Sequence, residues 1–189
     1  GGGPARRLRE WLRRLETAAG APLRREAGME FGAVRAWWGA RRARRAPHEG
    51  IDLVFEIEGR FVEIYPVEPG VVVGVLPDYL GRTAAVARDG GGWCWLYAHL
   101  ELDGAVKVGE RVGCGTRLGC PSRNSSSACP PHAHLSLLRV SGEVEWAEVQ
   151  WDTIHEMEAL QFVPLDLGGG GGGGGDGGGG GGSGGSGGS

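Results

Sequence analysis

Six short segments rich in valine, isoleucine, tryptophan and tyrosine follow one another through the middle of the chain, and glycine, proline and aspartate separate them. No segment of helical period lies between them, so the sequence offers no crossover helices for a parallel sheet. The Asp89-Gly90 pair, followed by two more glycines, is typical of a tight turn between strands. We therefore predict a mainly β fold with a compact antiparallel sheet. The expected strands are 51–57, 61–65, 70–76, 83–87, 93–99 and 134–140.

The first twenty residues have the pattern of an amphipathic helix. Pro4 suits a first helical turn and Gly20 suits a helix end. Between them, large apolar residues recur at helical spacing on one face, with arginines on the other. We predict an N-terminal helix over residues 4–19 that packs on the domain; a helix lying on a membrane surface is the alternative. The apolar residues are Leu8, Trp11, Leu12 and Leu15.

Charge and composition divide the chain. Residues 1–47 hold 12 arginines and 4 glutamates, a net charge of +8, and the remainder holds 8 basic and 19 acidic residues, a net charge of −11. The simplest interpretation is that the basic N-terminal part docks on the acidic remainder of the same chain. The alternative is that it binds an anionic surface such as nucleic acid, lipid or an acidic cell-wall polymer. We predict a basic helix and linker in 1–30, a folded domain in 31–167 and a disordered Gly/Ser linker or tag in 168–189, through which a partner was joined.

The four cysteines contain no Cys-x-x-Cys pair, which argues against a structural zinc knuckle. Cys120 and Cys129 close a short loop rich in serine and proline, and we predict a disulfide between them in an oxidising compartment. Free thiols in a cytosolic protein are the alternative. No apolar run is long enough to cross a bilayer, and these residues include no signal peptide.

Four of the five histidines lie in patterns that suit metal chemistry. His132 and His134 begin a predicted strand, where alternate side chains project from the same face, although only one of them need bind a metal. His48 and Asp52 lie four residues apart around Gly50, whose backbone freedom we expect to let both side chains turn inward.

The remaining two histidines differ from each other. His99 ends the predicted strand 93–99, on the same face as Trp93, Trp95 and Tyr97, which line a groove or bury the back of the sheet. His155 lacks the second histidine of a His-Glu-x-x-His helix, and we predict that it is solvated. Zinc suits the set, since it prefers imidazole and carboxylate ligands and catalytic sites keep one position open for water.

The order of these motifs resembles that of the lysostaphin-type (LytM-like) zinc metallopeptidases, which cut peptidoglycan peptides. The similarity spans about residues 31–140 and includes six patterns in family order. They are Phe31-Gly32 with Arg35, His48-x-Gly50-x-Asp52-Leu53, Gly70-Val71-Val72, Tyr97-Ala98-His99-Leu100, Val108-Gly109 with Leu118-Gly119, and His132-x-His134-Leu135.

The resemblance implies a compact antiparallel β-sheet domain of the LytM/lysostaphin type. It implies that His48, Asp52 and His134 hold Zn²⁺ and that His99 and His132 act in catalysis. The implied activity is that of a zinc metalloendopeptidase acting on cross-links or stem peptides of peptidoglycan, in the extracellular space or the periplasm.

Two stretches depart from the family pattern and concern the substrate rather than the metal. Ser127-Ala128-Cys129-Pro130-Pro131 replaces the usual residues before His-x-His, and Leu135-Ser136-Leu137 replaces the aromatic and acidic residues after it. A non-catalytic module that binds cell wall or activates a hydrolase is one alternative. A nucleic-acid binder is a second, but the cluster of Arg41, Arg42, Arg44 and Arg45 has no nucleic-acid motif beside it, so we expect no nucleic-acid partner.

Overall fold

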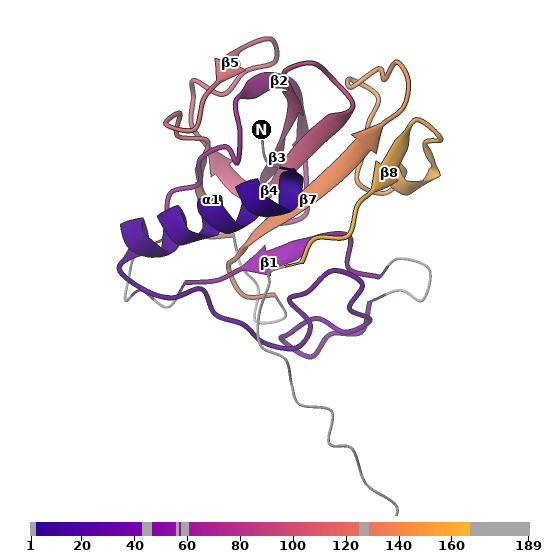
Figure 1. The fold of residues 1–189 in the computed structure, drawn as a ribbon. Helices are drawn as coiled ribbons and strands as arrows, with labels where there is room; N and C mark the ends of the chain where they lie inside the picture. Colours follow the sequence, from indigo (N-terminus) through magenta and orange to yellow (C-terminus); the bar gives the residue numbers. More distant parts are fainter. Residues whose placement is uncertain (1–2, 43–46, 56, 58–60, 125–128, 167–189) are drawn as a thin grey trace, which may run out of the picture.

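The structure is a computed structural model that describes residues 3–42, 47–55, 57, 61–124 and 129–166. Within these residues eight strands form one antiparallel sheet and one α-helix lies across it (Figure 1). The predicted mainly β fold with an N-terminal helix is therefore confirmed. The elements are α1 (Pro4–Ala19), β1 (Ile51–Leu53), β2 (Gly70–Pro77), β3 (Arg82–Arg88), β4 (Trp93–Leu102), β5 (Arg111–Val112), β6 (Gly119–Pro121), β7 (Ala133–Val140), the 3₁₀ turn η1 (Ile154–Glu156) and β8 (Leu160–Phe162).

The sheet runs in the order β1-β7-β4-β3-β2-β5. β7 pairs with β4 along one edge and with β1 and then β8 along the other. β4 changes neighbour near its end, where it leaves β7 and pairs with β6. This pairing sets Asp52 opposite His134 and His134 opposite Ala98. Three segments that are distant in sequence therefore end close together.

The short strands are where the structure differs from the sequence prediction. The predicted strand 61–65 is wrong, because only Ile64 forms an isolated bridge, with Gly119. The predicted strand 51–57 is limited to β1, and residue 56 lies outside the described part. β5, β6 and β8 span two or three residues each, which is too short to produce a recognisable alternation of apolar and polar side chains.

The apolar face of α1 forms one layer of the core. Trp11 is 1% exposed, lies edge-on to Tyr97 with ring centroids 6.4 Å apart, and donates its indole N–H to the carbonyl of Tyr65 at 2.7 Å. The helix ends at Gly20, whose φ of +66° is the left-handed conformation that glycine adopts readily. The prediction of a structural helix is confirmed. The four predicted apolar residues, Leu8, Trp11, Leu12 and Leu15, are all buried.

The opposite face of the sheet is covered by the segment that follows β7. Its Val149 and Ile154 are buried against Leu96 of β4 and Leu138 of β7. Trp95 and Tyr97 point the other way, into the core beneath α1. These two aromatic side chains therefore bury the back of the sheet and line no groove.

The basic helix docks mainly through its apolar face. Arg7 pairs with Glu68 at 3.1 Å, as the docking interpretation expects, whereas Arg9, Arg13 and Arg14 are exposed. No helix among the described residues is long and apolar enough to span a membrane. The predicted linker 168–189 lies outside the described residues.

The predicted disulfide is wrong. Cys94, Cys114, Cys120 and Cys129 are all free thiols in the structure. Cys120 lies within β6, where its backbone pairs with Glu101 of β4. Cys129 is instead placed beside Tyr79. No covalent bridge joins Cys120 and Cys129 in the structure.

Replacing Trp11 with alanine is expected to lower the free energy of unfolding by about 3–5 kcal/mol, because it removes a fully buried aromatic ring and leaves a cavity between helix and sheet. Denaturant unfolding followed by circular dichroism measures the change. Arg14→Ala, on the exposed face of the same helix, is the matched control and should change stability by less than about 0.5 kcal/mol. Equal effects of the two substitutions would contradict the packing of α1.

Candidate metal centre

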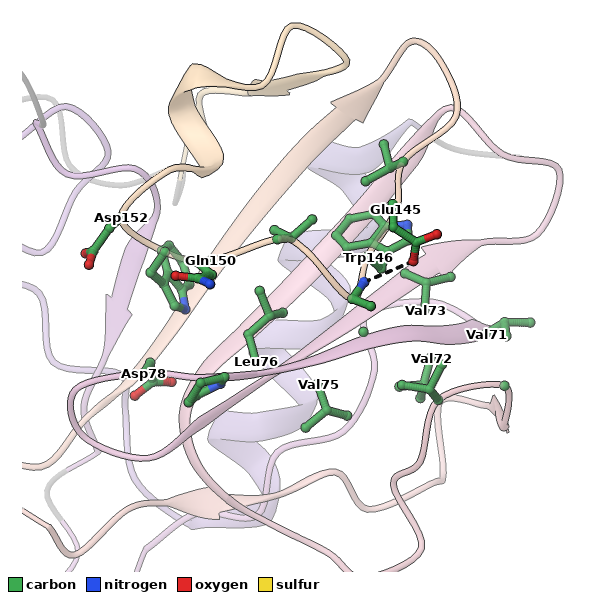
Figure 2. A pocket seen from close by; sticks show the side chains of 18 of the residues that line it. Val71, Val72, Val73, Val75, Leu76, Asp78, Glu145, Trp146, Gln150 and Asp152 are labelled. Atoms are coloured by element: carbon green, nitrogen blue, oxygen red, sulfur yellow. Dashed lines mark hydrogen bonds between the residues drawn. The ribbon is translucent and has the colours of Figure 1, made fainter.

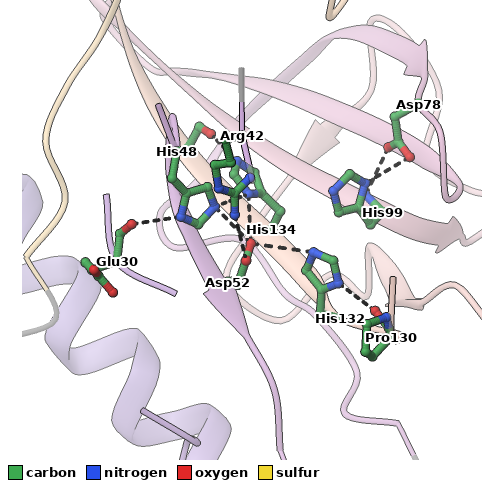
Figure 3. Close-up of polar contacts among 10 residues, drawn as sticks. Glu30, Arg42, His48, Asp52, Asp78, His99, Pro130, His132 and His134 are labelled. Carbon is green, nitrogen blue, oxygen red and sulfur yellow. Dashed lines mark hydrogen bonds and ion pairs between the residues drawn. The ribbon is translucent and has the colours of Figure 1, made fainter. Parts of the chain in front are cut away.

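His48 is held by the backbone of an earlier loop. Its Nδ1–H donates to the carbonyl of Glu30 at 2.8 Å, so the lone pair of Nε2 faces the opposite way. That Nε2 atom lies 3.0 Å from Asp52 Oδ1 and 3.0 Å from His134 Nδ1 (Figure 3). The backbone N–H of His48 also donates to the carbonyl of Ala33. Backbone carbonyls therefore hold both the main chain and the ring of His48.

Asp52 and His134 come from paired strands. They are direct cross-strand partners of β1 and β7, and His134 Nδ1 lies 3.1 Å from Asp52 Oδ1. The other ring nitrogen, Nε2, lies 2.8 Å from the hydroxyl of Ser136, two residues further along the same face of β7. Ser136 accepts from Nε2–H in the tautomer that leaves the Nδ1 lone pair free. Ser136 thus orients His134 as Glu30 orients His48.

The electrostatics of the cluster suit a cation. Burial lowers the pKa of His134 to about 3, so the ring is neutral at pH 7. Burial opposes ionisation of Asp52, but the contacts with His134 and His48 outweigh it and hold the pKa of the carboxyl well below its usual value. Neutral imidazoles and an ionised carboxylate are the protonation states that metal ligands need.

Three acceptor atoms thus converge in a buried space: His48 Nε2, Asp52 Oδ1 and His134 Nδ1. All three residues could hold one metal ion, since their ligand atoms lie within 4.8 Å of one another. Ligand atoms about 2.0–2.1 Å from a tetrahedral zinc ion lie roughly 3.4 Å apart, close to the separations seen here. The residues present therefore fit a zinc ion.

His132 lies beside the cluster, at the start of β7. Its Nδ1–H donates to the carbonyl of Pro130 at 2.8 Å, and its Nε2 lies 3.5 Å from Asp52 Oδ1. Burial lowers the pKa of His132, so the neutral ring presents a free lone pair toward the site. The structure thus turns both histidines of the His-x-His pattern toward Asp52.

His99 reaches the site through an irregularity in β4. The register of β4 against β3 shifts between Tyr97 and Leu100, and His99 has a φ of +62°. Such a left-handed conformation is uncommon outside glycine. It moves the ring off the face that Trp95 and Tyr97 share, so the predicted common face is wrong. The ring of His99 instead lies 4.9 Å from that of His132 and 5.7 Å from that of His134, between centroids.

Asp78 holds His99 in place, and sequence reasoning missed it. Asp78 Oδ1 accepts from His99 Nδ1–H at 3.0 Å, and Oδ2 accepts from the backbone N–H of His99 at 2.9 Å (Figure 3). Leu80, Gly81 and Thr83 donate three more hydrogen bonds to the same carboxylate. Burial opposes ionisation of Asp78, but the hydrogen bonds from His99 outweigh it and lower the pKa of the carboxyl.

A pH dependence of stability follows from Asp78. Because its pKa is lower in the folded chain than in the unfolded chain, ionised Asp78 stabilises the fold above about pH 4, and this contribution is lost as the pH falls below that value. We expect wild type to exceed Asp78→Asn in unfolding free energy at pH 7, with a smaller gap at pH 3. Urea unfolding of both proteins at the two pH values measures this difference in unfolding free energy. A difference that is independent of pH would contradict the stabilising role of the ionised carboxylate.

Gly50 has a different role from the predicted one. Its φ is not left-handed, so backbone freedom is not what the position uses. A Cβ atom at residue 50 would overlap the carbonyl of Leu135 and lie 2.7 Å from His134 Nε2 and 2.6 Å from Ser136 Oγ. Only glycine lets β1 approach β7 this closely.

Gly50→Ala is therefore expected to destabilise the fold by about 1–3 kcal/mol, as overpacking does, and to weaken metal binding because the added methyl group displaces His134. Thermal unfolding and a zinc titration measure the two effects. The control is Gly104→Ala, where a Cβ atom meets nothing within 4 Å. A Gly50→Ala protein with unchanged zinc affinity would contradict the close approach.

Arg42 and several aromatic rings surround the histidines. Arg42 lies 3.4 Å from Asp52 Oδ2 and over the ring of Trp38, so this member of the predicted basic cluster serves the site; residues 43–46 lie outside the described part. The ring of Tyr79 is 4.6 Å from that of His99, and the ring of Trp151 is 5.7 Å from that of His134. No spacing signal in the sequence marked Tyr79 or Trp151 as site residues, whereas Ser136 follows from strand alternation.

The fold and the site together define a class of protein: a compact antiparallel sheet with a buried His-Asp-His cluster that could hold a metal ion. No protein-family model and no curated protein sequence matches the chain. Among solved structures, the catalytic domain of the antimicrobial peptidase lysostaphin from Staphylococcus simulans is similar, with 19% sequence identity and a TM-score of 0.50 over 68% of this chain and 88% of that chain.

Two further solved structures have lower TM-scores. LytU has 24% identity and a TM-score of 0.46, over 68% of this chain and 79% of that chain. A protein described as cbpa from L. salivarius REN has 17% identity and a TM-score of 0.49, over 75% of this chain and 84% of that chain. The chain has the fold of the lysostaphin catalytic domain, as the resemblance in its motifs implied.

Proposed function

We propose that this chain is a zinc metalloendopeptidase that hydrolyses peptide bonds in bacterial peptidoglycan, within a cross-link or a stem peptide. One observation carries the proposal. Three ligand atoms from His48, Asp52 and His134 converge in a buried space, and the rings of His99 and His132 lie beside them. Two further histidines are more than a structural metal site needs, since structural zinc sites are closed by four protein ligands.

In this proposal His48 Nε2, Asp52 Oδ1 and His134 Nδ1 hold the ion. A zinc ion in such a site polarises a carbonyl and lowers the pKa of a bound water to about 7. Glu30 and Ser136 keep the two ligand rings in the tautomers that expose the required lone pairs.

The other two histidines handle protons. His132, neutral and anchored by Pro130, offers Nε2 as the acceptor of a proton from the attacking water. His99, anchored through Nδ1 by Asp78, turns its Nε2 away from that carboxylate and donates from it to the developing oxyanion when the ring holds both protons.

The substrate and the location follow from the same proposal. We place the protein in the cell envelope, outside the cytoplasm, where peptidoglycan lies. The named neighbour lysostaphin is described as an antimicrobial peptidase, which supports a peptide bond as the target. Four free thiols in the structure give no support for an oxidising compartment.

Metal analysis of the purified protein, together with digestion of purified peptidoglycan, tests the proposal. We expect about one zinc ion per chain, release of peptides detectable by mass spectrometry, complete loss of release with a chelator and recovery with added zinc. A folded protein that binds zinc but releases no peptide would contradict the proposed peptidase activity. A protein that binds no metal and still binds cell wall would instead support the non-catalytic module.

A further inference from the structure

A groove of about 1010 Å³ runs along the outer edge of the sheet, apart from the metal cluster but ending beside it. β2 forms one side and the segment 144–152 forms the other (Figure 2). At one end lie Val108 and Gly109, next to the short strand β5. At the other end lie Tyr79 and Trp151, whose rings contact His99 and His134. The groove therefore leads to the proposed catalytic residues.

The edge of β2 that faces this groove is largely unpaired. β5 pairs only with Gly70 and Val71, and Val72 exchanges hydrogen bonds with Gly109 and Glu110. Within the described ranges, no strand pairs with residues 73–77 along that edge. An unpaired edge of this kind offers backbone donors and acceptors to an added strand.

The hairpin that follows β2 shows which backbone groups are free. Asp78 N–H donates to the carbonyl of Gly81 and closes the hairpin. Bonded and non-bonded pairs alternate along an antiparallel ladder, so Val75 opposite Ala84 is a non-bonded pair. The N–H and C=O of Val75 therefore point away from β3, toward the free edge.

The walls of the groove indicate the kind of strand that fits. Val73 and Val75 are partly exposed, and the ring of Trp146 lies over Gly74, within 3.5 Å of where a Cβ atom would be. A strand bound here would therefore lie against apolar side chains. Trp151 donates its indole N–H to Thr83, which holds the far wall in position.

The charge of the far wall favours a cation. Residues 143–158 hold six carboxylates and no lysine or arginine. Two of the six, Glu145 and Asp152, are exposed and line the groove, and neither forms an ion pair within the described part of the chain. A positively charged amine on the bound strand would complement these negative carboxylates.

We propose that this groove binds an extended peptide that carries a primary amine, and that the peptide adds to the free edge of β2 as an antiparallel or parallel strand. This inference rests on the proposed peptidase function, because the bound strand is the part of the substrate that flanks the bond to be cut. Backbone hydrogen bonds to Val75 fix the register of the bound strand against β2. The negative charges of Glu145 and Asp152 favour a peptide with an amine.

The test uses an acetylated and amidated peptide of alternating glycine and alanine with one central lysine. It is titrated into the full chain carrying His99→Ala, so that the probe is not turned over, and amide chemical shifts locate the contact. We expect shifts in residues 73–77 and 144–152. Val75→Pro removes the outward N–H and leaves the β2–β3 ladder intact, and should weaken binding about fivefold. Val75→Thr keeps that N–H and should bind within twofold of the parent protein.

A charge-matched pair of double variants tests the amine. Glu145→Gln with Asp152→Asn should weaken binding about threefold and abolish any preference for the lysine probe over the same peptide with glutamate. Glu143→Gln with Glu148→Gln removes the same charge from the same segment but outside the groove, and should retain the preference.

The outcomes separate this inference from the proposed function. Equal binding to Val75→Pro and Val75→Thr, shifts that map elsewhere, or a concentration-dependent dimer that covers β2 would overturn the groove as a peptide site. Digestion of peptidoglycan by wild type without probe binding at β2 overturns this inference alone. Probe binding at β2 without any digestion supports the groove and contradicts the peptidase.

Discussion

Replacing His134 with alanine is expected to remove zinc from the protein and to abolish release of peptides from peptidoglycan. His134 Nδ1 is one of three ligand atoms that converge in the described site, 3.0 Å from His48 Nε2 and 3.1 Å from Asp52 Oδ1. Loss of a residue that merely orients a ligand costs about 10–100-fold in metal affinity, so loss of the ligand itself should cost more. Asp52→Ala should behave in the same way.

Zinc content after dialysis measures this effect, and circular dichroism checks that each variant is folded. His155→Ala is the matched control, because His155 is 43% exposed on the 3₁₀ turn η1 and is not one of the three converging ligands. Ser136→Ala should be intermediate, with zinc affinity reduced about 10–100-fold, since it removes only the partner of His134 Nε2. If His134→Ala keeps one zinc ion per chain, the metal site is elsewhere.

Replacing Asp78 with asparagine is expected to lower kcat about 100-fold or more while zinc content stays at one per chain. General acid–base groups contribute about 10²–10⁴-fold to rate, and His99 performs this role only if its ring is oriented. An asparagine has one acceptor oxygen in place of two, so it cannot accept from both Nδ1–H and the backbone N–H of His99 as Asp78 does. The ring is then free to change tautomer or rotate.

Two readouts separate positioning from a general loss of stability. The pH profile of kcat/KM should change shape in Asp78→Asn, and nitrogen chemical shifts should report a changed tautomer for His99. Asp103→Asn is the matched control, because Asp103 also caps a turn through the N–H two residues on but pairs with Arg117 in place of a histidine. An Asp78→Asn protein with wild-type kcat and an unchanged pH profile would show that Asp78 serves only the turn.

The sequence predicted the long strands well because alternation and turn residues are local signals. β2, β3, β4 and β7 each span seven or more residues and match the predicted segments closely. β5, β6 and β8 were missed because two or three residues cannot show a period. Their pairing depends on where other strands pass, which is information from the fold.

The site was only partly predictable. Strand alternation indicated that His132 and His134 share a face, and spacing suggested that His48 and Asp52 act together. Neither signal could show that His99 leaves the face of Trp95 and Tyr97, because the register shift and the left-handed backbone at His99 arise where β4 meets β3.

Local sequence thus determined the mainly β class, the apolar face of α1 and the set of candidate ligands, because each depends on neighbours a few residues away. Tertiary structure decided what holds those ligands. The carboxylate of Asp78 meets His99 across 21 residues, the carbonyl of Glu30 meets His48 across 18, and the glycine at 50 is required by a strand that lies 85 residues further on at Leu135. Contacts at such separations depend on how the strands pair, and no local pattern of side chains encodes them.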